Sequence, residues 1–312
     1  MEFKHISVMS EEVIRELNIR EDGIYVDGTL GGAGHSSAII SMLGSDGRLI
    51  GIDQDADAIA ASSSLIGSDE RVTIVKSNYS RMDEVLAELD IEAADGILLD
   101  LGVSSHQFDD RSRGFSYHTD EPLDMRMDKE KSFTAADVVN TYSEAELKKI
   151  LYEYGEEKYA ASIAGNIIRK RSEHKIETTM QLVDIIRASM PEREKNKKGH
   201  PARKTFQALR IEVNSELDVL KSSIGMMIEL LNPDGRLAII TFHSLEDRIV
   251  KKAFLQAEDP CICPKDFPVC TCGRKSKGRM EPHRPIVPTE DEIRDNPRSR
   301  SAKLRIFRKQ QA

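Results

Sequence analysis

The chain has 312 residues, of which 39% are hydrophobic and 31% are charged. This length is enough for one large domain or two ordinary ones, and the composition is typical of a globular protein that buries a core. The sequence shows neither a charged-then-apolar leader nor an apolar run of membrane-spanning length. We therefore expect a cytoplasmic protein without a membrane partner.

The net charge is −8, but the charges are unevenly distributed. Residues 166–210 contain 12 Lys and Arg against 5 Asp and Glu, and residues 274–312 contain the same numbers. Such blocks can be solvated helix faces. Two of them in an acidic protein favour a polyanionic partner instead.

A glycine-dense turn near the N-terminus separates two apolar stretches. Residues 24–27 predict a strand that ends on Asp27, and residues 49–53 predict one that ends on Asp53. Four glycines lie in the turn after the first strand: Gly28, Gly31, Gly32 and Gly34. Glycines allow a backbone to turn tightly beside a ligand, and an acid about 20 residues further on is placed to bind ribose hydroxyls.

This spacing fits neither the dinucleotide pattern nor the methyltransferase turn strictly. Asp27 at the start of the turn favours a cationic ligand such as the sulfonium of S-adenosylmethionine and disfavours a pyrophosphate. The alternative is a packing turn without a ligand. The combination of Asp27 and Asp53 favours a nucleoside.

The first hundred residues alternate between helices and strands. We expect helices at 10–17, 35–43, 56–65 and 82–89, and strands at 24–27, 49–53, 72–75 and 97–100. The strands are almost wholly apolar, which is typical of a parallel sheet covered on both faces. Three strands end in aspartate, at Asp27, Asp53 and Asp100. Ligands of such sheets bind beyond the strand ends, so these acids mark a candidate site.

After Asp100 the alternation stops for over a hundred residues, which read as an inserted set of helices. Residues 195–203 predict a basic loop, and residues 204–231 predict one long helix. Residues 232–235 then predict a turn, 236–242 a strand, 244–256 a helix, and 303–307 a strand at a sheet edge with one wet face.

Six stretches together resemble one family. They read DGTLGGAGHS, LLDLGVSSHQFDD, RGFSY with PLDMRMD, RKTFQALRIEVNSEL, TFHSLEDRIVK and NPRSRSAKLR. They extend over most of the chain, in the order found in the ribosomal RNA small subunit methyltransferase H family. The resemblance implies an α/β fold, namely a class I (Rossmann-like) S-adenosylmethionine-dependent methyltransferase sheet with an inserted all-helical domain. We expect the methyltransferase domain at 1–113 and 209–312, and the insert at 114–208.

The resemblance also implies the cofactor and the substrate. The methyl donor would be S-adenosylmethionine, and the acceptor N4 of a decoding-site cytidine in 16S rRNA of the small ribosomal subunit. Carried over by position, the cofactor contacts are Ala33, Gly34, His35, Asp53, Tyr79, Asp100 and Gln107. Tyr79 and Gln107 come from the resemblance alone, since an isolated tyrosine is more often a core residue.

The group that activates the cytosine amine stays open. An acceptor for one N–H of the amine would localise its lone pair and assist proton removal. Many DNA amino-methyltransferases use an acid, Asn or Ser before two prolines and an aromatic residue, and this chain has no such proline pair after Asp100. The candidates are Asp100, Ser104, Ser105, Asp109 and His243, and His243 could equally be a strand-end residue satisfied by the backbone.

Basic residues of the loop after the fourth strand and of the insert are the candidates for phosphate contacts. They are Arg111, Arg113, Arg126, Lys195, Lys197, Lys198, Arg203 and Lys204. For Arg111, Arg113 and Arg126 the alternative is a structural ion pair with a nearby aspartate.

The four cysteines of the chain all lie between Cys261 and Cys272. Their C-x-C and C-x-C spacing could close a tetrahedral zinc site, although C-x-x-C is the usual zinc spacing. Reduced thiols without metal are the alternative.

Three other functions remain open at this point: a DNA amino-methyltransferase, a nicotinamide-dependent oxidoreductase and a non-catalytic RNA-binding assembly factor. The missing proline pair argues against the first, and Asp27 with the imperfect glycine spacing argues against the second. The sequence leaves monomer and homodimer equally open.

Overall fold

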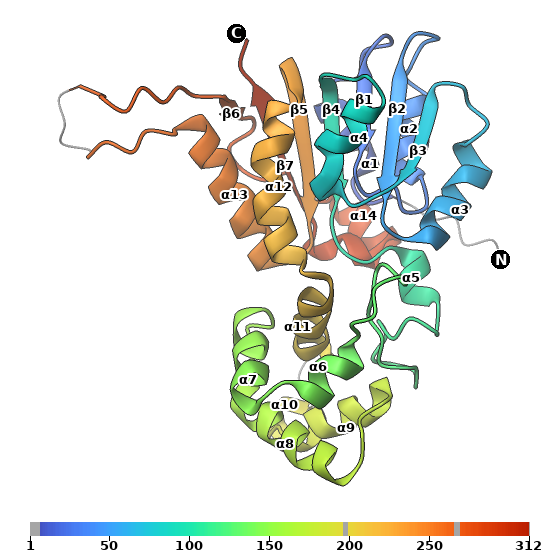
Figure 1. Ribbon diagram of the computed structural model, residues 1–312, viewed down its shortest axis with the longest axis vertical. Coiled ribbons are helices and arrows are strands. Elements are labelled where there is room, and N and C mark those ends of the chain that lie inside the picture. The colour runs from blue at the N-terminus through green and yellow to red at the C-terminus, as the bar shows by residue number, and fades with distance from the viewer. Residues whose placement is uncertain (1–6, 196–198, 265–268, 312) are drawn as a thin grey trace. The chain divides into compact units, whose positions relative to one another are not determined.

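The computed structural model describes residues 7–195, 199–264 and 269–311. The chain forms two compact units, shown in Figure 1. The sheet unit comprises Met1–Gly102 and Leu217–Ala312, and the helical unit comprises Val103–Glu216. Residues 103–113 and 209–216, which we expected in the methyltransferase domain, thus belong to the helical unit. Within the residues that the structure describes, none of the helices combines the length and apolar character needed to cross a bilayer.

A seven-stranded sheet forms the centre of the sheet unit, in the order β3-β2-β1-β4-β5-β7-β6. The first five strands are parallel, and β7 is antiparallel to both β5 and β6. Its strands are β1 (Ile24–Asp27), β2 (Arg48–Asp53), β3 (Val72–Lys76), β4 (Ala94–Asp100), β5 (Leu231–Thr241), β6 (Gly278–Met280) and β7 (Lys303–Lys309). The chain order reverses between β1 and β4, which is where ligands bind in open α/β sheets.

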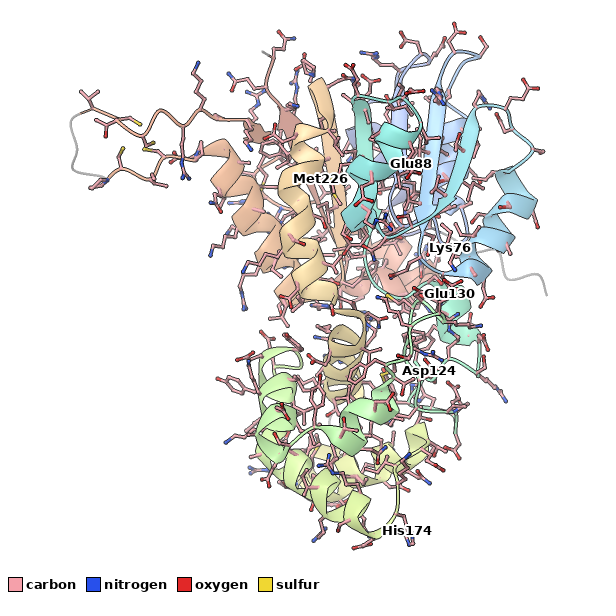
Figure 2. All side chains as sticks on the ribbon, viewed as in Figure 1. Lys76, Glu88, Asp124, Glu130, His174 and Met226 are labelled. Carbon is pink, nitrogen blue, oxygen red and sulfur yellow. The ribbon has the colours of Figure 1, made fainter. Side chains whose placement is uncertain are left out.

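Helices cover both faces of the sheet, as the apolar strands predicted. One face packs against α1 (Ser10–Leu17), α2 (Gly34–Ile40) and α3 (Ala56–Ile66). The other packs against α4 (Met82–Glu88), α12 (Glu216–Glu229) and α13 (Ser244–Glu258). Glu88 on α4 and Met226 on α12 mark this second layer in Figure 2. The unit also holds the short helices η1 (Tyr79–Arg81), α14 (Glu290–Asp295) and η2 (Pro297–Ser301).

The helical unit has its own apolar core, built from the faces of its helices. The helices of this unit are α5 (Ser105–Asp109), α6 (Ala135–Thr141), α7 (Glu144–Glu153), α8 (Ala160–Glu173), α9 (Thr179–Ala188), α10 (Glu192–Lys195) and α11 (Arg203–Asn214). Thr134, Ser143 and Thr178 form capping boxes that start α6, α7 and α9. Each box satisfies backbone N–H groups that a helix start would leave unpaired.

The single long helix predicted at 204–231 is wrong, because the chain breaks it into α11 and α12 at Ser215. Ser215 has left-handed backbone angles (φ 53°, ψ 34°). The buried Asn214 side chain before it donates to Met125 O at 2.8 Å and accepts from Met127 N at 2.8 Å. This use of Asn214 by a distant segment fixes the end of α11, which the apolar periodicity did not reveal.

The C-terminal strands also differ from expectation. The predicted edge strand β7 lies inside the sheet, between β5 and β6, and β6 was not predicted. Arg305 of β7 is buried because Asp247 of α13 pairs with it at 2.6 Å. The predicted turn 232–235 lies within β5: Leu231 pairs with Ala94 and Arg236 with Gly96, so the residues between form an irregularity in the strand.

Candidate functional site

The three strand-end aspartates lie at two depths in the sheet. Asp27 pairs in register with Gly51 and Leu98, two residues before Asp53 and Asp100. Asp53 and Asp100 are therefore at the rim of the carboxyl edge, and Asp27 is set below it. The sequence grouped the three acids correctly at one edge, but the register separates their roles.

Asp27 is buried and occupied by the protein itself. Its Oδ1 accepts from Thr29 N at 3.1 Å, and its Oδ2 accepts from the Ser36 hydroxyl at 2.7 Å. Burial raises the pKa of Asp27, although the His35 charge and these hydrogen bonds oppose the shift. Asp27 thus ties the glycine turn to α2, and our interpretation of it as an acid facing a cationic ligand is wrong.

Asp53 also organises the turn, but from the rim. Its Oδ2 accepts from Gly31 N at 2.8 Å and its Oδ1 from Asp55 N at 2.8 Å. Burial raises the pKa of Asp53 to about 6, although the two N–H donors oppose the shift. A carboxylate oxygen accepts more than one hydrogen bond, so each oxygen of Asp53 keeps capacity for a further donor.

Asp100 and His35 face each other beside this turn. Asp100 N donates to the Thr29 hydroxyl at 2.6 Å, and Asp100 Oδ2 lies 3.5 Å from His35 Nε2. Burial lowers the pKa of His35, but Asp100 and Asp27 outweigh it, so the net shift is upward. Within the described residues, Asp100 Oδ1 is buried and accepts no hydrogen bond. A buried acceptor without a donor is uncommon, which makes Asp100 a candidate acceptor for a ligand N–H or O–H.

The remaining cofactor candidates of the sheet unit line the same edge. Ala33 precedes α2 in the left-handed conformation (φ 59°), which is unusual for a residue with a Cβ atom. Tyr79 starts η1, and its Cβ lies beside Gly28. A Cβ on Gly28 would lie 2.6 Å from a methyl carbon of Leu99, so this glycine is required for packing. In contrast, a Cβ on Gly32 would meet nothing within 4 Å.

Comparisons with known proteins identify the family of the chain. A model of the MraW methylase family matches residues 2–310. The chain belongs to this family. It is 60% identical over 308 residues to the ribosomal RNA small subunit methyltransferase H of Lachnospira eligens, with 98% of each chain covered. It is 58% identical over 311 residues to the ribosomal RNA small subunit methyltransferase H 2 of Agathobacter rectalis (99% of each), and 55% identical over 309 residues to that of Clostridium botulinum strain Kyoto (99% of this chain, 100% of that one).

Membership of the MraW methylase family confirms the resemblance noted in the sequence. It also confirms the class I methyltransferase fold with a helical insertion and S-adenosylmethionine as the methyl donor. The oxidoreductase alternative is thereby excluded, because that reaction takes a different cofactor.

Four further candidates lie in the helical unit, at and before α5. Ser104 Oγ accepts from Gln107 N at 3.1 Å, and Gln107 Oε1 accepts from Ser104 N at 3.1 Å. This reciprocal pair caps the helix and leaves Gln107 buried. Ser105 is the first residue of α5, and Asp109, the last, is exposed.

Three of the arginines predicted to contact RNA lie in the segment after β4, each in a different environment. Arg113 is 1% exposed and donates to Arg126 O and Met127 O, both at 3.0 Å. The prediction that Arg113 binds RNA phosphate is therefore wrong, because its guanidinium is enclosed by its own unit. Arg126 forms a two-point pair with Asp124 at 2.6 and 2.8 Å and donates to Lys129 O at 3.1 Å. Arg111 is exposed. Figure 2 labels Asp124 and Glu130, both in the segment after β4.

The predicted basic loop of the insert is described only in part. Lys197 and Lys198 lie outside the described residues, and Lys195 is the last residue of α10. Arg203 at the start of α11 is exposed. Lys204 Nζ donates to Glu156 O at 2.7 Å.

His243 is the N-cap of α13 in a capping box. Its Nδ1 accepts from Glu246 N at 3.4 Å, and its Nε2 lies 3.1 Å from Glu246 Oε1. The environment of His243 therefore fits the alternative given from the sequence, a strand-end histidine satisfied by the backbone.

The basic residues of the C-terminal block 274–312 are largely paired within the protein. Lys303 and Arg305 share Asp247, and Arg308 pairs with Asp234 at 2.9 Å.

Two hydroxyl residues of the site were missed in the sequence. Thr29 links the turn to Asp100, and Ser62 of α3 donates to Gly31 O at 2.7 Å. The triplet Asp27-Gly-Thr was the available signal, because an aspartate side chain commonly bonds the backbone two residues on. Ser62 gave no such signal, since its partner is 31 residues away.

Proposed function

We propose that this chain transfers a methyl group from S-adenosylmethionine to N4 of cytosine 1402 in 16S rRNA of the small ribosomal subunit. The observation that carries the proposal is the full-length identity of 60% to a ribosomal RNA small subunit methyltransferase H. Its support in this chain is the carboxylate-lined rim at the reversal point of the sheet, which suits a nucleoside ligand.

The residues at the rim fit S-adenosylmethionine. Its ribose carries two hydroxyl donors, and Asp53 has two oxygens with capacity left for them. Its amino group is a cationic donor, and Asp100 Oδ1 is an acceptor that has no hydrogen bond among the described residues. We assign Ala33, Gly34 and His35 to the backbone and side-chain wall beside Asp53, and Tyr79 to the adenine face. Gln107 is proposed from the family resemblance alone.

When bound, S-adenosylmethionine supplies an electrophilic methyl group. The chain must then hold the cytosine amine in line with that methyl and exclude water, since positioning supplies much of the rate gain in such transfers. The amine has to lose one proton as the new N–C bond forms, so an acceptor for its N–H is needed. Asp100, Ser104, Ser105, Asp109 and His243 remain the proposed acceptors.

The base must also leave its stack to reach the rim, which single-stranded or splayed RNA permits at low cost. Phosphate contacts position such a strand without reading its sequence. Arg111 and Arg203, both exposed, are the proposed contacts in the described part of the helical unit, and Lys195, Lys197 and Lys198 complete the proposed basic loop.

The experiment is a methyl-transfer assay with radiolabelled S-adenosylmethionine. Small subunits from a strain that lacks this modification, naked 16S rRNA and duplex DNA are offered in parallel, and the labelled nucleoside is identified by mass spectrometry. We expect N4-methylcytidine at one position of the rRNA. Label in DNA alone would show a DNA amino-methyltransferase, and binding of small subunits without label would show an assembly factor.

A further inference from the structure

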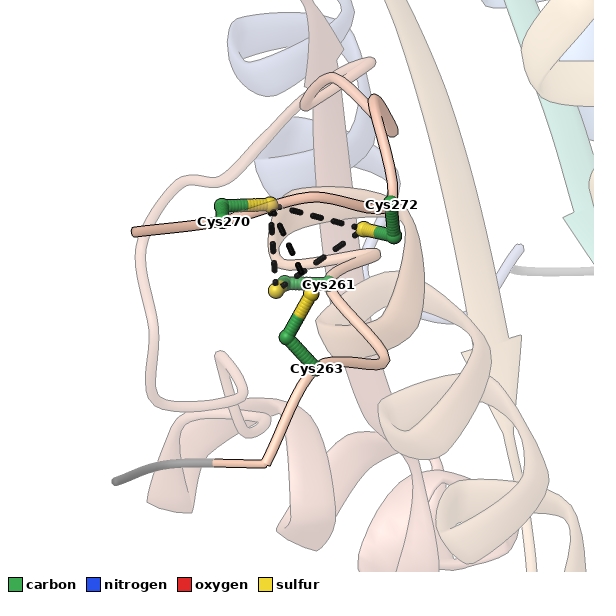
Figure 3. Close-up of side chains that lie close together, drawn as sticks. All are labelled: Cys261, Cys263, Cys270 and Cys272. Atoms are coloured by element: carbon green, nitrogen blue, oxygen red, sulfur yellow. Dashed lines mark hydrogen bonds between the residues drawn. The ribbon is translucent and has the colours of Figure 1, made fainter. Parts of the chain in front are cut away.

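The four cysteines form a compact sulfur cluster that the methyl-transfer chemistry does not use. They lie in the segment 259–277, which connects α13 to β6 and contains no helix or strand among its described residues. We call this segment the cysteine arm. Figure 1 shows it leaving α13 and returning to β6, and Figure 3 shows the four side chains turned toward a common centre.

The sulfur spacing matches a single tetrahedral metal ion. Sγ of Cys270 lies 3.6 Å from Cys261, 3.9 Å from Cys263 and 3.5 Å from Cys272, and Cys261 and Cys272 are 3.9 Å apart. All four sulfurs lie within 4.8 Å of one another. Four thiolates at about 2.3 Å from a tetrahedral zinc ion are about 3.8 Å from each other. We propose that the cysteine arm binds one Zn²⁺ through Cys261, Cys263, Cys270 and Cys272.

The surroundings of the sulfurs favour a metal over bare thiols. Thr271 N donates to Cys263 Sγ at 3.4 Å, an orientation that suits a thiolate. The arm carries four Lys and Arg against two Asp. Its net charge of +2 offsets the −2 of a zinc ion with four thiolates, so the complex is locally neutral.

The fold of the arm also requires a crosslink. The apolar side chains of Ile262 (65% exposed) and Val269 (70% exposed) are not packed into a core, so the described residues of the arm have no apolar core to hold them. A connection of this length without secondary structure is seldom ordered unless something joins its ends. A metal clip would join the two C-x-C pairs and hold the described residues on either side in place.

Disulfides and iron–sulfur clusters fit the spacing less well. A disulfide joins two sulfurs at about 2.05 Å and leaves no reason for all four to converge. A multinuclear cluster would hold the sulfurs further apart than one ion does. Thiolate ligands and tetrahedral geometry favour zinc over the divalent ions that prefer oxygen ligands, and the metal analysis below separates zinc from iron.

The test is metal analysis of the full-length protein, purified without chelator. We expect about one zinc ion per chain, and four thiols that react with a disulfide reagent only after chelation. Because the chain has no other cysteine, the thiol count reports on the arm alone. After exchange, Co²⁺ should give the intense visible bands of a tetrahedral tetrathiolate site. Trypsin should then cut the arm faster in the metal-free protein.

Variants make the assignment specific. Cys261→Ser with Cys270→Ser should abolish stoichiometric zinc, whereas Val269→Ala, in the same exposed arm, should retain it. Zinc-free protein with four freely reactive thiols would overturn the proposal, as would two disulfides or bound iron. Retention of stoichiometric zinc by the double serine variant would place the metal elsewhere and overturn it as well.

Discussion

The rim of the sheet unit and the Arg113 segment of the helical unit use charged side chains in opposite ways. At the rim, Asp53 and Asp100 accept backbone or histidine contacts on one side and keep acceptor capacity on the other. In the helical unit, Arg113 and Arg126 direct their donors to carbonyls and to Asp124 of their own unit. We propose that the first arrangement receives a ligand, whereas the second holds an irregular segment together.

The difference shows that the charge of a side chain does not by itself reveal whether the residue binds a ligand or stabilises the fold. A buried arginine that donates to carbonyls satisfies acceptors that an irregular chain cannot pair within a helix or sheet. Burial of a carboxylate at the rim lowers the stability of the fold, and a hydrogen-bond donor from a bound ligand would offset that cost. Three experiments test whether these two descriptions hold, and a fourth tests how α11 ends.

The largest effect is expected for Arg113→Ala. The change removes the donors to Arg126 O and Met127 O and leaves a cavity in a buried site. We expect a loss of about 3–5 kcal/mol in the free energy of unfolding, measured by urea denaturation. Arg111→Ala, two residues away and exposed, should change it by less than about 0.5 kcal/mol. A stable Arg113→Ala protein with weakened RNA binding would instead return Arg113 to the RNA contacts.

Asp53→Ala should weaken cofactor binding and leave RNA binding unchanged. Loss of a charged acceptor for two ribose hydroxyls is expected to cost about 1.5–3 kcal/mol, or roughly 10- to 150-fold in affinity. Calorimetric titration with S-adenosylmethionine measures the effect. Glu88→Ala, exposed on α4, is the charge-matched control. Equal affinity in both variants would mean that the ribose does not bind at Asp53.

Cofactor affinity should also depend on pH through the same carboxyl. The pKa of Asp53 is raised to about 6, so the carboxyl is ionised above that pH and protonated below it. Protonation removes acceptor capacity, so affinity should fall as the pH falls through 6, approaching about tenfold per pH unit. The Asp53→Asn variant removes this titration but keeps His35 and Asp27. If its affinity fell in the same way, the pH dependence would belong to another group.

Much of the sheet unit was predictable because its signals are local. Apolar runs predicted the strands β1 to β4. The acids at the ends of three of them predicted the rim, because parallel strands bring their carboxyl ends to one edge of the sheet. The separate depths of Asp27 and Asp53 depend on strand register, which no single strand encodes. Arg305 shows the same limit: its charge in an alternating strand predicted a wet face, but Asp247 of α13 pairs with it.

The helical unit was less predictable because its polar residues act over long distances in sequence. The partners of Arg113 are 13 and 14 residues away, and Asn214 bonds a residue 89 positions earlier. Periodicity identifies the apolar faces of such helices but not where a side chain from elsewhere ends them. The break at Ser215 is therefore a tertiary effect, and it can be tested separately.

Ser215→Gly should stabilise the protein slightly, because Ser215 has a left-handed backbone that glycine adopts without a Cβ clash. We expect a gain of about 0.5 kcal/mol, after the extra entropy of glycine in the unfolded chain is deducted. Ser222→Gly is the matched control: Ser222 is exposed within α12, where glycine should cost about 0.5–1 kcal/mol. Thermal unfolding of the two variants should therefore shift in opposite directions. A loss of stability in both would mean that residues 204–231 form a continuous helix in solution, as the sequence predicted.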